Sequence, residues 1–157
     1  MLDTLRSFLA ELTGAPRQGR FEENDYRLAA AALLVHVTTV DGVVSDLERR
    51  KLHAVIKYRF KLDDDATDEL IDEATQVEGE SVDLYHFTSL LNRSLDEDGR
   101  RRIIEMMWEL IYADGHVSEF EDNLVWRVAD LLGISSRERI ELRQQVAAQQ
   151  SGTDKAG

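Results

Sequence analysis

The sequence predicts an all-α protein, a compact bundle of about seven or eight helices built from a duplicated helix–turn–helix unit. Its 157 residues include one proline and are rich in Ala, Leu, Glu, Arg and Asp, a composition that favours helix. Apolar residues recur at helical spacing between turn signals. The motif Asp-Gly-x-Val-Ser-x-x-Glu occurs twice, at 41–48 and at 114–121. Together these observations predict two copies of one helix–DGxVSxxE–helix unit.

We expect one helical domain over residues 21–150, since a chain of 157 residues has the length of a single domain. Residues 1–20 predict an amphipathic helix followed by a connector that contains glycine and proline. The apolar face of this helix carries Leu2, Leu5, Leu9 and Leu12. Docking of this face on the rest of the fold and docking on a partner are both open. Residues 151–157 are expected to form a frayed tail.

Four helices are predicted in the first half of the domain. Residues 22–40 are apolar almost all round, which is typical of a helix at the centre of a bundle. Asp41-Gly42 ends this helix, because glycine suits the left-handed conformation that follows a helix. The remaining elements are a helix at 45–61, one that begins at 63–65, a turn at 78–83 and a short helix at 84–91.

The second half repeats this pattern. Residues 94–113 are again strongly apolar and end in Asp114-Gly115, and further helices are expected at 118–132 and from Ser135. The two turns are 114 − 41 = 73 residues apart, and at this offset apolar residues of the first buried helix fall on apolar residues at 103–110. The sequence therefore predicts an internal duplication, with the two helical hairpins packed about a pseudo-twofold axis.

Each repeated turn contains the spacing of a capping box. Ser45 is placed to accept a hydrogen bond from the backbone N–H three residues on, and Glu48 to reach back to the serine N–H. Such a cap stabilises a helix by about 1 kcal/mol without any ligand. The same spacing also occurs at 94–97 and 135–138, so serine and glutamate alone indicate only where helices begin.

The aspartates of the two turns are less easily explained. Asp41 and Asp114 follow buried helices, and at a helix C-terminus the macrodipole makes a carboxylate unfavourable by about 0.3–1 kcal/mol. A positive group is therefore expected near each aspartate. One candidate is a hard cation such as Ca²⁺ or Mg²⁺, which prefers carboxylate and carbonyl oxygens, although the spacing is not that of an EF-hand. The other is a salt bridge to one of the basic residues at 49–51, and the residues alone leave a structural turn and a cation site equally open.

Composition narrows the remaining classes of function. The formal net charge of −12 repels phosphate backbones and anionic membranes, whereas cations and basic proteins remain suitable partners. Without cysteine there can be no disulfide and no thiolate ligand or nucleophile. The four histidines lack the spacing of a helical zinc site, and no catalytic motif is present. We expect no enzyme, no signal peptide and no transmembrane segment.

The two turns, Asp41-Gly-Val-Val-Ser-Asp-Leu-Glu48 and Asp114-Gly-His-Val-Ser-Glu-Phe-Glu121, resemble those of the TerB-like family of tellurite-resistance-associated proteins, and the resemblance covers roughly residues 26–145. It implies an all-α duplicated fold, a cytoplasmic location and an acidic metal-binding face without catalytic chemistry. The metal ligands that it implies are Asp41, Glu48, Asp114 and Glu121. This chain departs from the family pattern at Leu47 and Phe120, where an acidic residue is common, and at Asp122, where a basic one is.

These observations lead to two hypotheses. The first is a non-enzymatic sensor or adaptor that binds a divalent cation at the two turns and meets a basic or membrane-associated protein partner. A link to tellurite or metal stress is raised by the resemblance but does not follow from it, because TerB-like domains also occur outside tellurite operons. The second is a metal-free acidic module for protein–protein interaction. The oligomeric state is left open.

Overall fold

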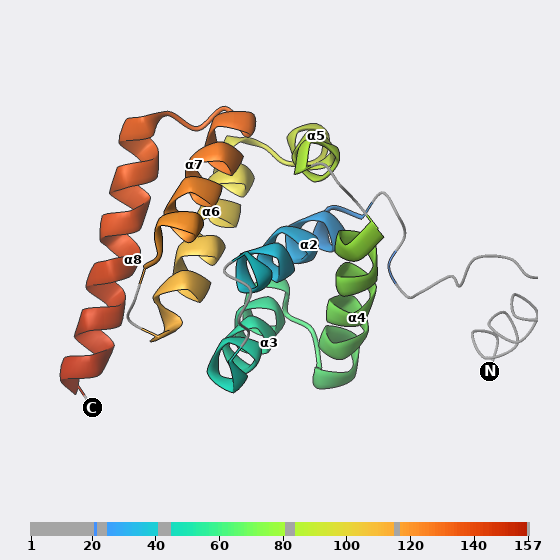
Figure 1. Cartoon of the computed structure of the whole chain (residues 1–157), viewed down its shortest axis with the longest axis horizontal. Helices are drawn as coiled ribbons and strands as arrows, with labels where there is room; N and C mark the ends of the chain where they lie inside the picture. The colour runs from blue at the N-terminus through green and yellow to red at the C-terminus, as the bar shows by residue number, and fades with distance from the viewer. Residues whose placement is uncertain (1–20, 22–24, 41–44, 81–83, 115–116, 157) are drawn as a thin grey trace, which may run out of the picture.

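The computed structural model describes residues 21, 25–40, 45–80, 84–114 and 117–156, without the side chains of Glu80, Asp114 and residues 150–156. All regular structure in these residues is helical, which confirms the predicted all-α class. Its elements are α2 (Tyr26–Thr39), α3 (Asp46–Phe60), α4 (Asp64–Glu80), α5 (Leu84–Ser94), α6 (Glu97–Ile111), the 3₁₀ helix η1 (Tyr112–Asp114), α7 (Glu119–Leu131) and α8 (Ser136–Ala156) (Figure 1).

Helix α2 lies in the middle of the molecule. It packs against α3, α4, α5 and α6, and Figure 1 shows it between the pair α3 and α4 and the group α6, α7 and α8. Ten of its 14 residues are buried, because the sequence is apolar on nearly every side. The expected central helix is therefore confirmed. The second buried helix is α6, and its Trp108 is fully enclosed.

Helices α3 and α7 end in the same way. Lys61 has a φ of 53°, and the N–H of Leu62 donates to the carbonyl of Lys57 at 3.1 Å. At α7, Gly133 has a φ of 74°, and the N–H of Ile134 donates to the carbonyl of Ala129 at 2.9 Å. Each pair of equivalent positions is 72 residues apart, as 133 − 61 and 134 − 62 show. These correspondences are what a duplication would leave, and the duplication itself stays a prediction.

Several boundaries differ from the sequence-based expectation. Ser94 does not cap a helix: it is the last residue of α5, and α6 is capped by Asp96, whose Oδ1 accepts from the N–H of Gly99 at 2.8 Å. Aspartate is as good a cap as serine, and the N–H of Leu95 still bonds to α5 through the carbonyl of Leu91. Of the turn expected at 78–83, residues 78–80 belong to α4 and the rest lies outside the described residues. Helix α8 continues to Ala156, past the start of the expected tail.

Candidate cation site at the two repeated turns

The first turn is capped as predicted. Ser45 has extended backbone angles of φ −83° and ψ 161°, and its side chain accepts a hydrogen bond from the N–H of Glu48 at 3.0 Å. Asp46 and Glu48 both lie in the first turn of α3, where the positive end of the helix dipole favours carboxylates. Glu48 is half-buried. The serine therefore has a local structural role whether or not a ligand is bound.

The second turn has the same backbone geometry and forms both hydrogen bonds of a capping box. Ser118 has φ −83° and ψ 160°, and its hydroxyl accepts from the N–H of Glu121 at 3.1 Å. In return, Oε1 of Glu121 accepts from the N–H of Ser118 at 3.0 Å, which makes a full capping box. The angles of the two serines agree within one degree, so the two copies of the motif adopt one local structure at their helix starts.

Two of the four predicted ligands, Glu48 and Glu121, belong to the described side chains. Asp41 and the side chain of Asp114 lie outside them, so the convergence of all four carboxylates stays a prediction. Helix α3, whose first turn carries Glu48, packs against η1, and η1 ends at Asp114. Among the described side chains, no group of three or more histidines and acids is arranged to hold a metal ion.

Arg143 supplies a positive group beside the second turn that sequence reasoning missed. Its Nη1 donates to Oδ1 of Asp122 at 3.1 Å, and its Nε donates to the hydroxyl of Tyr112 at 2.8 Å. The guanidinium also lies 5.1 Å from the centre of the Trp108 ring, within the range of a cation–π contact. Arg143 therefore engages Asp122, an extra acid next to the predicted ligand Glu121.

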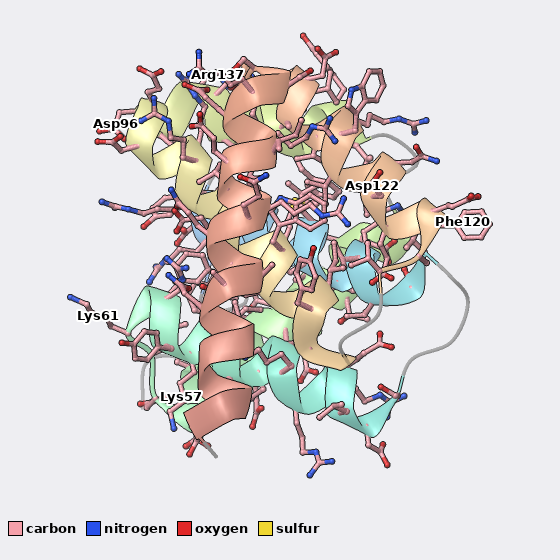
Figure 2. The ribbon with its side chains drawn as sticks, turned by 90° about the vertical axis from the view of Figure 1, so that its left-hand side faces the viewer. Lys57, Lys61, Asp96, Phe120, Asp122 and Arg137 are labelled. Atoms are coloured by element: carbon pink, nitrogen blue, oxygen red, sulfur yellow. The ribbon has the colours of Figure 1, made fainter. Side chains whose placement is uncertain are left out.

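Two of the three departures from the family pattern are exposed apolar side chains. Leu47 is 46% exposed and Phe120 is 63% exposed. They occupy equivalent positions, each immediately before the glutamate of its turn, and Figure 2 shows Phe120 projecting from the start of α7. Each repeated turn therefore presents one apolar side chain among acidic neighbours.

Two histidines pair with acids of α4. Nδ1 of His36 lies 2.8 Å from Oε1 of Glu78, and the ring of His53 lies 3.1 Å from one oxygen of Asp64 and from one of Asp68. Hydrogen bonds from Lys57 and His53 hold the pKa of Asp64 below its ordinary value. These pairs tie α4 to α2 and α3.

The fold and the two capped turns define the class of protein as an all-helical bundle in which two helices begin with the same turn geometry. A family model described as Tellurite resistance protein TerB matches residues 27–144. The matched region runs from the first turn of α2 into α8 and includes both turns, so the chain belongs to the TerB family. No curated protein matches the chain, and no solved structure matches it. None of the described helices has both the length and the apolar character needed to cross a membrane.

Proposed function

We propose that the chain is a non-enzymatic, cytoplasmic TerB protein that senses or transmits the binding of a divalent cation of the Ca²⁺ or Mg²⁺ type. The proposed ligands are Asp41, Glu48, Asp114 and Glu121. In this proposal the ion neutralises repulsion among carboxylates from the two halves of the chain and fixes the surface that is offered to a protein partner. The proposal extends to a link with tellurite or metal stress, which membership of the TerB family raises and cation binding by itself does not imply.

The observation that carries this proposal is the packing of α3 against η1. Helix α3 starts with the turn that contains Glu48, and η1 leads into the turn that contains Glu121. This contact brings the helix that follows the first turn against the element that precedes the second turn. It supports a single site formed by the two motifs, because residues far apart in the sequence must be brought together to share one ion. The nearly identical backbone angles of Ser45 and Ser118 support equivalent roles for the two glutamates.

Capping leaves Glu121 able to coordinate a cation. The capping bond of Glu121 uses Oε1, and a carboxylate has a second oxygen that can bind a hard cation. The net charge of −12 also raises the local concentration of cations around the protein. The same side chain can therefore start a helix and bind an ion, which would make the helix start sensitive to metal.

Thermal unfolding with and without a divalent ion tests this proposal. An ion that binds only the folded state raises the melting temperature, with a stabilisation of about 2.7 kcal/mol at 100 times its dissociation constant. We expect Glu48→Gln and Glu121→Gln to abolish most of this rise while the cap persists, because glutamine also serves in a capping box. Ser45→Ala should instead lower stability by about 1 kcal/mol both with and without the ion.

Asp46→Asn and Glu119→Gln are matched controls. Each removes one negative charge from an exposed residue of the same helix starts, but neither removes a proposed ligand. Both variants should keep the rise in melting temperature. The proposal fails if Ca²⁺, Mg²⁺ and other divalent ions leave the melting of the parent protein unchanged at millimolar levels, or if the controls lose the effect as fully as the ligand variants.

The exposed side chains of Leu47 and Phe120 favour one alternative, a metal-free acidic module that docks a basic protein partner. Large apolar side chains surrounded by acids are suited to a partner segment that is both basic and apolar. This alternative takes the lead if no divalent ion affects melting. It then requires that Phe120→Ser weakens partner binding without lowering stability, since the side chain is 63% exposed.

A further inference from the structure

The outer side of α3 combines large apolar side chains with basic ones. The helix holds five basic and two acidic residues, a net charge of +3, although the whole chain has a net charge of −12. Leu47 and Tyr58 are 46% and 83% exposed, and they project from the same side because they are 11 residues apart, which is about three helical turns. The exposed basic residues on this side are Arg50, Lys57 and Lys61, and Figure 2 shows Lys61 pointing away from the bundle. These five residues form the outer face of α3, which is basic and apolar.

The outer side of α7 combines aromatic side chains with acidic ones. The helix holds four acidic residues and one basic one, a net charge of −3. Trp126 is 52% exposed and Phe120 is 63% exposed. Each is three residues from the exposed Asn123, so the two rings flank it on the same side of the helix. Glu119 and Asp130 are exposed there too. These five residues form the outer face of α7, which is acidic and aromatic.

Helices α3 and α7 occupy equivalent places in the predicted duplication. Each begins at one of the repeated turns, and at the offset of 73 residues Leu47 falls on Phe120 and Arg49 falls on Asp122. The two helices therefore expose an apolar side chain at the same position but carry opposite charges. In a single molecule both outer faces are exposed, so they do not cover one another. Each face complements the other in charge, and both offer the aromatic area that is enriched in protein–protein contacts.

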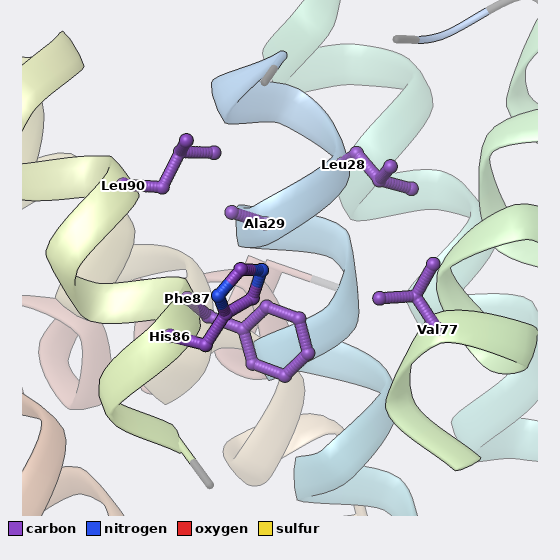
Figure 3. A pocket seen from close by; sticks show the side chains of 6 residues that line it. All are labelled: Leu28, Ala29, Val77, His86, Phe87 and Leu90. Atoms are coloured by element: carbon purple, nitrogen blue, oxygen red, sulfur yellow. The ribbon is translucent and has the colours of Figure 1, made fainter. Parts of the chain in front are cut away.

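The pocket between α2, α4 and α5 is too small to serve a partner in the same way. It has a volume of about 40 Å³ and lies between Leu28, Val77 and Phe87 (Figure 3). This volume holds about three water molecules, which is too little for a metabolite or for the side chains of another protein. The two outer faces are open on the surface, where a second protein molecule can reach them.

Electrostatics restricts how two copies of the chain can meet. A net charge of −12 opposes their association, so a stable contact must pair surfaces of opposite sign. Outside α3 the chain carries −12 − 3 = −15, and most pairings of its surfaces would bring acids together. The pairing of α3 with α7 instead brings basic residues against acidic ones. At about 0.15 M salt, charges more than about 8 Å apart are largely screened, so the charges at the contact itself have most influence.

We propose that two copies of this chain form a dimer in which the outer face of α3 of one copy packs on the outer face of α7 of the other. One contact between two helices is small compared with the roughly 1,200–2,000 Å² of a stable interface. A twofold axis makes the same contact twice, since α7 of the first copy then meets α3 of the second. The dimer does not depend on the proposed cation site, because none of the residues on the outer faces is a proposed ligand.

Analytical ultracentrifugation of the full chain in EDTA tests this proposal separately from the cation site. With divalent ions removed, we expect a concentration-dependent equilibrium between species of 17.9 kDa and 2 × 17.9 = 35.8 kDa. Failure of the proposed cation site would leave this result unchanged. A chain that stays monomeric up to millimolar concentration would overturn the proposal, as would one that grows beyond the dimer into longer assemblies.

Charge reversal identifies the two faces. Arg50→Glu with Lys61→Glu makes the outer face of α3 acidic, and Glu119→Lys with Asp130→Lys makes the outer face of α7 basic. Each double variant should be monomeric, because both of its contacts would pair like charges. An equimolar mixture of the two double variants should recover the dimer, because α3 of each variant then meets an α7 of opposite charge. Thermal unfolding verifies that each variant folds, and a mixture of folded variants that stays monomeric would contradict the pairing of α3 with α7.

Arg93→Glu with Arg137→Glu is the matched control. It changes the net charge by the same amount as the double variant of α3, at exposed residues of α5 and α8 that lie outside both faces. This control should keep the dimer. If it loses the dimer as fully as the variant of α3 does, total charge alone governs association and the proposed interface is wrong.

Removal of exposed rings tests the apolar part of the contact. Tyr58→Ser and Trp126→Ser should each raise the dissociation constant of the dimer by about tenfold or more, as truncation of an aromatic hot spot does. Both side chains are more than half exposed, so neither change should destabilise the monomer appreciably. Tyr85→Ser is the control, since Tyr85 is 60% exposed on α5 and lies outside both faces. Equal effects of all three variants would refute the assignment of the interface.

Discussion

Asp25 shows how one side chain sets the start of the central helix. Its Oδ1 accepts from the backbone N–H of Arg27 at 2.9 Å, and its Oδ2 accepts from the guanidinium of the same residue at 2.7 Å. Burial acts to raise the pKa of Asp25, but the hydrogen bonds from the side chain and backbone of Arg27 outweigh it. The pKa therefore lies below its ordinary value. The same carboxylate caps α2 and orients the arginine that covers Phe21.

The lowered pKa predicts how stability depends on pH. A carboxyl group whose pKa is lower in the folded state stabilises the protein above its unfolded pKa of about 3.9, and this contribution is lost as the pH falls through the folded value. Asp25→Asn keeps a good N-cap but removes the charge. We expect the difference in unfolding free energy between parent and variant, measured by urea titration, to shrink as the pH falls below about 4. A difference that stays constant from pH 6 to pH 2 would contradict this.

At the scale of the helix, the ends of α3 and α7 form the same backbone turn with different residues. The position after α3 holds Lys61 at a φ of 53°, and the equivalent position after α7 holds Gly133 at a φ of 74°. Left-handed backbone angles cost an ordinary L-residue about 1–2 kcal/mol, whereas glycine adopts them freely. The backbone at the end of α3 is therefore strained, whereas the backbone at the end of α7 is not.

This difference predicts opposite effects for two substitutions. Lys61→Gly should raise the unfolding free energy by about 0.5–1 kcal/mol, because relief of backbone strain exceeds the greater entropy of glycine in the unfolded chain. Gly133→Ala should lower it by about 1 kcal/mol. A methyl group at residue 133 would meet nothing within 4 Å, so that loss would come from the backbone and not from a clash. Chemical denaturation measures both, and a stabilising Gly133→Ala would refute this explanation.

At the scale of the whole molecule, Arg59 links the two halves of the bundle. It lies on α3 and bonds to Glu105 at 3.3 Å and to Glu109, both on α6. Burial disfavours the charged form of Arg59, but Glu109 and Glu105 more than offset this, so the pKa of the guanidinium is raised. All three side chains are less than 30% exposed, which limits the screening of their charges by water.

Loss of this link should weaken the packing of α3 on α6. Arg59→Met keeps much of the aliphatic stem but leaves two neighbouring carboxylates without their cation, and we expect a loss of about 1–3 kcal/mol in unfolding free energy. Adding Glu109→Gln to this variant should recover part of the loss, as a double-mutant cycle would reveal. Arg137→Met serves as the control: its pair with Glu141 is on the surface, with the arginine side chain 89% exposed, and should contribute about 0–1 kcal/mol.

Much of the local structure could be predicted from the sequence. The caps at Ser45, Ser118 and Ser135 were predicted and are present, because each depends on a hydrogen bond between residues three apart. The cap expected at Ser94 was wrong, since Asp96 offers a competing carboxylate two residues later and local rules do not decide between them. The assignment to the TerB family rested on the same short-range signals and is confirmed.

By itself, the sequence determined the all-helical class, the central position of α2 and the two capped turns, because helical periodicity and capping act over a few residues. Tertiary structure alone decided that Arg143 meets Asp122 and that Arg59 joins α3 to α6. The paired groups are 21 residues or more apart in the sequence, and each has several partners of suitable charge. Which of these partners they contact depends on how the helices pack, and short-range patterns do not encode that choice.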